Sequence, residues 1–181
     1  KLLHPWEQSL ITDINNAIAE NKSIPIDDDE VISILINAQH LETQTQTLFN
    51  PSIGKLIKLW GFHSDDYKQE TIPIKKVIQK LVLSNPSMQS IKIKNGILKS
   101  NNKDVQIDLG GYAKGYALDQ AKIILANNNV DNALINIGGN IMAFGKHGER
   151  DWVVGIQNPR KPNLLATITL KPGWAIGTSG D

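Results

Sequence analysis

Cysteine is absent from the 181 residues, which excludes disulfide bonds and cysteine nucleophiles and leaves the redox compartment undetermined. Histidine is scarce, and the four histidines are too scattered to form the cluster that a zinc site needs. They are His4, His40, His63 and His147.

An excess of one charge and long apolar runs are also missing. Lysine and arginine number 19 against 18 aspartates and glutamates, for a net charge of +1. With no basic excess to neutralise a phosphate backbone, nucleic acid is not expected as a partner. No apolar run approaches the roughly 20 residues of a membrane helix, and no signal peptide is visible. The hydrophobic fraction of 40% is typical of a globular domain.

The most informative segment is a glycine pair between a predicted strand and a predicted helix. Val105–Ile107 is β-branched and alternating, which predicts a short strand leading to Asp108. Gly110 and Gly111 lack a Cβ, so the backbone can turn sharply and a ligand can approach closely. Apolar and small residues then recur at helical spacing: Ala113, Tyr116, Ala117, Gln120, Ala121, Ile124 and Leu125.

This turn is suited to a phosphate, because a helix N-terminus presents free N–H groups and the positive end of its dipole. Lys114 in the first helical turn adds a positive charge, and Asp108 is placed to hold a cation or to accept a hydrogen bond from a ligand. The segment is neither a Walker A loop nor a G-x-G-x-x-G fingerprint. On the residues alone, a strand-to-helix turn that binds nothing therefore stays an alternative.

Four segments carry a family resemblance. Asp108–Asp119 reads DLGGYAKGYALD, Thr47–Leu56 reads TLFNPSIGKL and runs on to LWGF at Leu59–Phe62, Asn136–Asn140 reads NIGGN, and Ala175–Asp181 reads AIGTSGD. In this order they resemble the motifs of the ApbE family, the FAD:protein FMN transferases. The resemblance implies an α+β fold with N-terminal helices and a largely antiparallel sheet. It identifies residues 1–181 as the central part of one flavin transferase domain, truncated at both ends.

The resemblance also implies an activity. A Mg²⁺-dependent transferase would bind FAD, release AMP and leave FMN on a Ser or Thr hydroxyl of a target protein. The implied acceptors are flavoprotein subunits of membrane electron-transport complexes. The implied location is the periplasmic face of the inner membrane, through an N-terminal lipid anchor that is not in this chain.

Site residues follow from matching the motifs position by position. The implied flavin-nucleotide contacts are Leu48, Phe49, Asn50, Asp108, Lys114, Gly138, Gly139, Asn140, Thr178, Ser179 and Gly180. Gly111 would ligate the metal through its backbone carbonyl. The catalytic groups and the remaining metal ligands are expected in a C-terminal portion absent here, so residues 1–181 alone are expected to be inactive. Two positions depart from the family pattern: Asn50 replaces Asp, which keeps a turn-forming role, and Ser52 replaces Thr.

Two alternatives to this activity remain open. The protein would be an FAD pyrophosphatase if FMN ends up free, and a flavin-binding module if neither AMP nor covalent flavin forms. Ser179 as a nucleophile lacks a His/Asp partner pattern, so a turn serine is the favoured interpretation.

The other elements are predicted from local patterns. A first helix is expected from Pro5 onward, and Asp27–Asp29 is expected to cap a second helix whose core face includes Val31 and Leu35. Asn95–Gly96 predicts a hairpin turn. Asn132–Ile137 is expected to be a buried strand. Gly138–Gly139 is expected to be a bulge, a close approach or a bend, and by resemblance a second wall of the nucleotide pocket beside the Asp108 turn.

Overall fold

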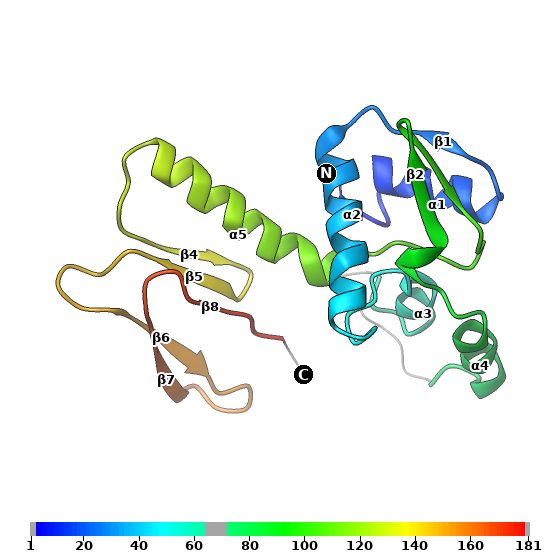
Figure 1. Ribbon diagram of the computed structural model, residues 1–181. Helices are drawn as coiled ribbons and strands as arrows, with labels where there is room; N and C mark the ends of the chain where they lie inside the picture. The colour runs from blue at the N-terminus through cyan, green and yellow to red at the C-terminus, as the bar shows by residue number, and fades with distance from the viewer. Residues whose placement is uncertain (1–2, 64–71, 180–181) are drawn as a thin grey trace. The chain divides into compact units, whose positions relative to one another are not determined.

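The computed structural model describes residues 3–63 and 72–179. The chain forms two compact units, Lys1–Gly111 and Tyr112–Asp181. Each unit is described by itself below (Figure 1). In the described residues, no helix combines the length and apolar character needed to cross a membrane.

Two capped helices provide much of the core of the first unit. Helix α1 is Leu10–Ala19, and helix α2 is Asp29–Gln44. The expectation that the first helix starts at Pro5 is wrong, because the Ser9 side chain accepts from the Thr12 N–H and so fixes the start at Leu10. The predicted cap of the second helix is confirmed, since Asp28 Oδ1 accepts from Val31 N at 3.0 Å.

A three-stranded antiparallel sheet packs with these helices. Its strands are β1 (Ile24–Pro25), β2 (Ile91–Lys94) and β3 (Ile97–Ser100), in the order β1-β3-β2. The predicted hairpin is confirmed: Asn95 and Gly96 have φ of 51° and 72°, as a tight two-residue turn requires.

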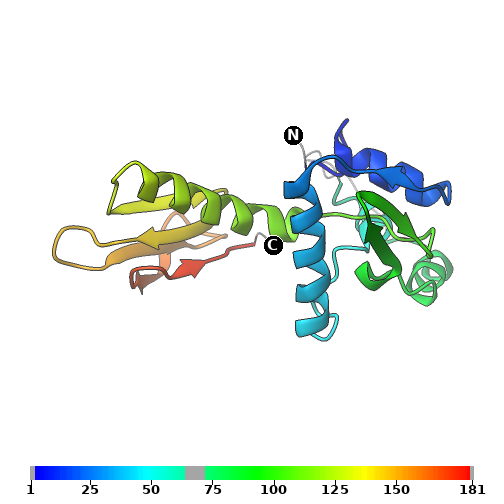
Figure 2. The ribbon, with the colours of Figure 1, turned by 45° about the horizontal axis from the view of Figure 1, so that its top comes forward.

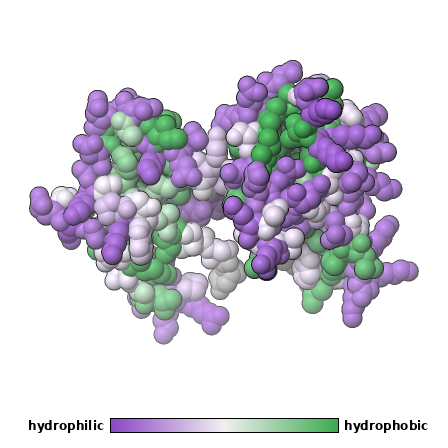
Figure 3. Space-filling view, viewed as in Figure 1, coloured by the Kyte–Doolittle hydropathy of each residue, from purple (hydrophilic) through white to green (hydrophobic). Residues whose placement is uncertain are grey.

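Three short helices complete this unit: α3 (Gly54–Leu59), α4 (Lys75–Leu83) and the 3₁₀ turn η1 (Met88–Ser90). All residues of α4 are described, and none of them is buried. Ile74, at its start, is 72% exposed, and Leu83, at its end, is 83% exposed. Figure 3 shows hydrophobic residues next to hydrophilic ones over α4, at the lower right.

The segment that leads to the glycine pair is extended but is not a strand of a sheet. Val105, Ile107 and Leu109 are at most 1% exposed, and an isolated parallel bridge joins Gln106 to Ile53. The prediction of a strand at Val105–Asp108 is therefore wrong. Backbone hydrogen bonds and one side chain, described below, take the place of a neighbouring strand.

The second unit combines helix α5 (Gly110–Asn127, whose first two residues belong to the first unit) with two small sheets. One sheet has the order β4-β5-β8 and the other pairs β6 with β7. The strands are β4 (Ala133–Ile137), β5 (Asn140–Phe144), β6 (Trp152–Gln157), β7 (Leu164–Leu170) and β8 (Ala175–Ile176). Both views show α5 running alongside the β4–β5 hairpin (Figures 1 and 2). Every strand ladder among the described residues is antiparallel, as predicted.

Two details of the second unit differ from expectation. Leu118 is the buried residue of α5, whereas Ile124, placed on the apolar face by spacing, is 61% exposed. Strand β4 is half-buried rather than fully buried, because its residues alternate between partial exposure and exposure. The core of this unit is formed by Ala143, Val154 and Leu170 instead.

Candidate functional site

The turn between the buried segment and α5 is ordered by Asp108. The residue Asp108 is 9% exposed, and its Oδ1 accepts from Gly110 N at 2.8 Å. This is the side-chain-to-backbone bond of an Asx turn. A Cβ on Gly110 would lie 3.0 Å from the same oxygen, so glycine fits the turn better than any larger residue. Asp108 thus shapes the backbone at the start of α5.

The loop before α3 holds this turn through backbone bonds. Asp108 N donates to Pro51 O at 2.8 Å, and Gln106 N donates to Ser52 O at 3.1 Å. Gly54 N donates to Gln106 O at 2.8 Å, and a Cβ on Gly54 would lie 2.6 Å from that oxygen. Two of the family-like segments, Thr47–Leu56 and Asp108–Asp119, are therefore joined directly.

The loop residues Leu48, Phe49 and Asn50 lie at this junction in different ways. Leu48 is 94% exposed. The Phe49 ring contacts the turn, since a Cβ on Gly111 would lie 3.9 Å from Phe49 Cε2. Asn50 Nδ2 donates to Pro86 O, and Asn50 Oδ1 accepts from Ser52 N, both at 2.9 Å. The predicted turn-forming role of Asn50 is confirmed.

Lys114 is exposed and lies beyond the first turn of α5, because the helix begins at Gly110. Its placement in the first turn was therefore wrong. Tyr112 is half-buried, and burial raises the pKa of its phenol, with the Asp119 carboxylate raising it further.

A pocket of about 700 Å³ occupies the second unit. It is lined by the β4–β5 turn, by Val154–Gln157 of β6, by Leu165 of β7 and by the segment from Ile176 to Ser179. Four predicted contacts line it: Gly138, Gly139, Thr178 and Ser179. Its volume is in the range of small-molecule sites.

Gly138 and Gly139 form the two-residue turn of the β4–β5 hairpin, with φ of 54° and 86°. A bulge, a close approach or a bend was predicted here. The structure shows a tight turn whose backbone closely approaches another segment. Gly139 O accepts from Thr178 N at 3.2 Å and from Thr178 Oγ1 at 2.9 Å. A Cβ on Gly139 would lie 2.4 Å from Thr178 Oγ1. The NIGGN and AIGTSGD segments thus meet at one contact.

The remaining predicted contacts of this unit lie around the same turn. Asn140 is the first residue of β5. A Cβ added to Gly177 would lie 3.8 Å from Asn140 Oδ1. Ser179 is exposed. Gly180 lies outside the described residues. The two glycine turns belong to different units, so the expectation that they line one pocket stays a prediction.

The described residues do not supply a complete metal site. Within 3–63 and 72–179, no group of three or more histidine, aspartate or glutamate side chains is placed to hold a metal. Gly111, the predicted metal ligand, could offer only its backbone carbonyl. A Mg²⁺ ion, which prefers several oxygen ligands, would thus need further ligands from elsewhere.

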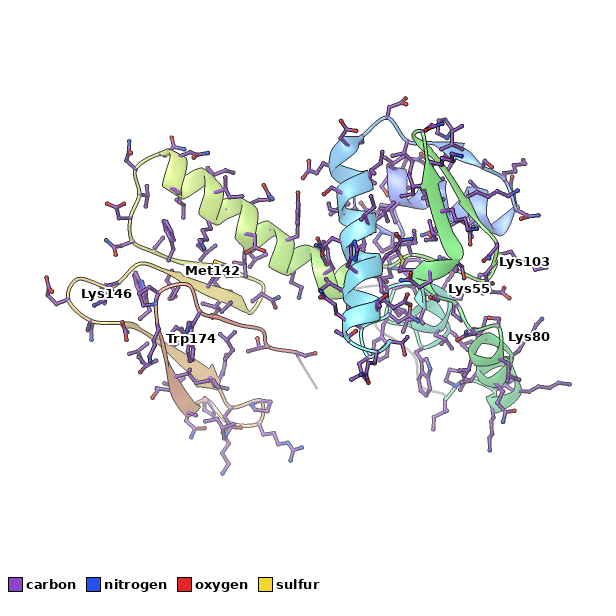
Figure 4. The ribbon with its side chains drawn as sticks, in the orientation of Figure 1. Lys55, Lys80, Lys103, Met142, Lys146 and Trp174 are labelled. Atoms are coloured by element: carbon purple, nitrogen blue, oxygen red, sulfur yellow. The ribbon has the colours of Figure 1, made fainter. Side chains whose placement is uncertain are left out.

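The first unit contains an ion pair between Lys55 and Asp104. Lys55 Nζ lies 2.8 Å from Asp104 Oδ1 and donates to Lys103 O at 2.9 Å (Figure 4). The hydrogen bond from Lys55 lowers the pKa of Asp104.

Sequence reasoning missed two kinds of residue. The pocket wall from Val154 to Gln157 and Leu165 was not predicted as part of a site, although Gly155 inside a strand is a signal for a close approach. A Cβ on Gly155 would lie 2.8 Å from Leu164 Cδ2. Asn15, whose carboxamide bonds both backbone groups of Ile107, carried no local signal.

Comparison with known proteins gives a consistent result. The sequence model of the ApbE family matches residues 1–181. The chain is 34% identical over 178 residues to the FAD:protein FMN transferase of Rhodobacter capsulatus, covering 98% of this chain and 34% of that protein. It is 28% identical over 179 residues to a FAD:protein FMN transferase of Klebsiella pneumoniae (strain 342), covering 96% of this chain and 52% of that protein. The chain thus spans about a third to a half of the length of these relatives.

Solved structures agree. The ApbE protein of Thermotoga maritima MSB8 superposes with a TM-score of 0.82 at 31% identity, over 97% of this chain and 56% of that one. The apo form of the flavinyl transferase ApbE of Pseudomonas stutzeri superposes with a TM-score of 0.76 at 25% identity, over 96% of this chain and 52% of that one. The α+β architecture expected from the sequence is therefore confirmed.

Proposed function

Because this chain belongs to the ApbE family, we propose that the whole protein transfers FMN from FAD to a Ser or Thr hydroxyl of a target protein. In this reaction the hydroxyl oxygen forms a bond to the FMN phosphorus, the bond between that phosphorus and the bridging oxygen breaks, and AMP leaves. The hydroxyl proton passes to a base, which is expected outside this chain. The names of the similar proteins support the substrate and the reaction.

One observation carries the proposal: two separately predicted motifs meet at one pocket. Gly138–Gly139 and Thr178–Ser179 are nearly 40 positions apart, yet both line the cavity of about 700 Å³. The bond from Thr178 to the Gly139 carbonyl fixes the turn there. A tight glycine turn lets a ligand approach the main chain closely.

The residues of this chain would bind and orient the dinucleotide. The Gly110 N–H is taken by Asp108 Oδ1, which fixes the turn, so the groups that the start of α5 would offer to a phosphate are the N–H groups after it. Mg²⁺, when bound, would neutralise phosphate charge, and the Gly111 carbonyl is the ligand this chain would supply. The remaining ligands and the base are proposed to come from the portion of the protein outside this sequence.

The proposed partner is a protein with an accessible Ser or Thr. The description of the relatives as FAD:protein FMN transferases supports a protein acceptor. Flavoprotein subunits of membrane electron-transport complexes are proposed from the family resemblance.

The test uses the full-length protein with FAD, Mg²⁺ and a purified candidate acceptor. AMP release is followed by chromatography, and covalent flavin by fluorescence of the acceptor after denaturing electrophoresis. We expect AMP and protein-bound flavin in equal amounts, and no reaction after chelation until Mg²⁺ is restored. AMP with only free FMN would show a pyrophosphatase, and tight FAD binding without AMP would show a binding module. Residues 1–181 alone are expected to give no covalent flavin.

A further inference from the structure

We propose that Asn15 is a positioning residue for the Asp108–Gly111 turn. Its buried carboxamide holds the backbone from which that turn presents N–H and carbonyl groups to the FAD diphosphate. The proposal rests on the proposed function and adds to it a residue from α1, which none of the family-like segments contains.

The contacts of Asn15 are specific and complete. Asn15 lies on the buried face of α1 and is 7% exposed. Its Oδ1 accepts from Ile107 N at 2.7 Å, and its Nδ2 donates to Ile107 O at 2.9 Å. The side chain thus pairs with both polar backbone groups of one residue, as the backbone of a neighbouring strand would.

Packing alone does not account for an asparagine at this position. Ile11, Ile14 and Ile18, which share its face of α1, are at most 1% exposed. A carboxamide among such residues lowers stability unless it is hydrogen-bonded, and asparagine is a poor helix former. The bonds to Ile107 offset the burial, and Ile107, which is itself 0% exposed, would have no other partner for its N–H.

The extended segment is held from two sides. Gln106 and Asp108 donate their N–H groups to the carbonyls of Ser52 and Pro51. Ile107, between them, is bonded by Asn15. Successive residues of an extended chain direct their polar groups to opposite sides, so the loop holds one side and Asn15 holds the other.

Asn15 is coupled to the turn through a short path. Ile107 directly precedes Asp108, whose Oδ1 accepts from Gly110 N at 2.8 Å. Release of Ile107 would therefore displace the Asp108 carboxylate, and with it the start of α5 that this carboxylate orders, including the carbonyl of Gly111. Since diphosphate and metal are bound by fixed backbone groups, looser positioning weakens binding.

The experiment compares Asn15→Ala with Asn16→Ala in the full-length protein. Asn16 is the neighbouring residue on the same helix and is exposed, so it is a control matched in residue type and helix propensity. Three quantities are measured: the FAD dissociation constant by flavin fluorescence, the amide hydrogen exchange of 105–111 without FAD, and the melting temperature. Asn15→Ser is the milder variant, because it introduces no charge and keeps a neutral hydroxyl, which is too short to bond both backbone groups of Ile107.

We expect Asn15→Ala to raise the FAD dissociation constant about tenfold or more and to accelerate exchange at Ile107 and Gly110. Asn15→Ser should lie between it and the wild type, and it carries the test if Asn15→Ala does not fold. Asn16→Ala should match the wild type in all three. A folded Asn15 variant with a lower melting temperature but an unchanged FAD dissociation constant would overturn the proposal, leaving a purely structural role. Failure of the wild type and Asn16→Ala to bind FAD would instead refute the proposed function.

Discussion

Gly111 and Gly139 have different surroundings, so a methyl group added at each position would have different effects. Gly111 lies in α5, its φ is not positive, and an added Cβ would touch only Phe49 Cε2, at 3.9 Å. Gly139 has a φ of 86°, and its added Cβ would collide with Thr178 Oγ1 at 2.4 Å. Stability therefore does not require glycine at 111, whereas it does at 139.

For Gly111→Ala we predict a protein that is more stable but binds FAD more weakly. Alanine in a helix stabilises by about 0.5–1 kcal/mol relative to glycine, while the methyl group obstructs close approach of a ligand to the turn. Thermal unfolding and FAD titration on the same samples measure both effects. An unchanged FAD dissociation constant would show that no ligand approaches this position closely.

For Gly139→Ala we predict a loss of about 1–3 kcal/mol in the free energy of unfolding, because the residue is strained and displaces Thr178. Gly138→Asn is the matched control: Gly138 has a φ of 54° but nothing within 4 Å of an added Cβ, and asparagine tolerates this conformation. Urea unfolding compares the two. Equal losses would contradict the contact between Gly139 and Thr178.

The Lys55–Asp104 pair predicts a pH dependence. The pKa of Asp104 is lowered from 3.8 by Lys55, so the pair stabilises the fold above that value, and the contribution is lost as the pH falls through the pKa of the folded protein. Asp104→Asn should therefore lower stability by about 0.5–1 kcal/mol at pH 7 and have no effect in strong acid. Urea unfolding at both pH values measures this, and a difference that persists in acid would rule out the ion pair as its source.

At the scale of helices and strands, a buried carboxylate joins α2 to η1. Glu42 is 1% exposed; its Oε2 accepts from Ser87 Oγ at 2.8 Å and its Oε1 accepts from Met88 N at 3.3 Å. The following turn also depends on this part of α2, since Thr47 N donates to Glu42 O at 2.8 Å. The end of α2 thus orders both the loop that carries Phe49 and the segment whose Pro86 carbonyl holds Asn50.

Glu42→Ala should lower the free energy of unfolding by about 2–4 kcal/mol, because buried donors lose their acceptor and a cavity forms. Gln44→Ala, at an exposed position of the same helix, should change it by less than about 0.5 kcal/mol. Urea unfolding measures both variants. Similar values for the two would mean that the carboxylate does not hold η1.

Local signals predicted local structure at this scale. Asp28 as a cap and Asn95–Gly96 as a turn depend on neighbours in the sequence, and both were predicted. The predicted strand at Val105–Asp108 and the buried position of Ile124 depend on packing against residues far along the chain, and these predictions were wrong. The start of α1 was also predicted wrongly, although its cap, Ser9, is a local signal. The motif residues around Gly139 were found through a family resemblance, while Asn15 was missed because its partner lies 92 positions away.

At the scale of the whole molecule, the central claim is that both glycine turns contact FAD. The first turn is built by Asp108 and the loop before α3, and the second by Thr178 and the β4–β5 hairpin. Each turn is ordered within its own unit.

Amide hydrogen exchange of the full-length protein with Mg²⁺, with and without FAD, tests this claim most directly. The prediction is that FAD slows exchange in two segments together, 108–113 and 136–140, while the β2–β3 turn at Asn95–Gly96 is unchanged. Protection that spares either glycine turn, at FAD concentrations that saturate the protein, would contradict it.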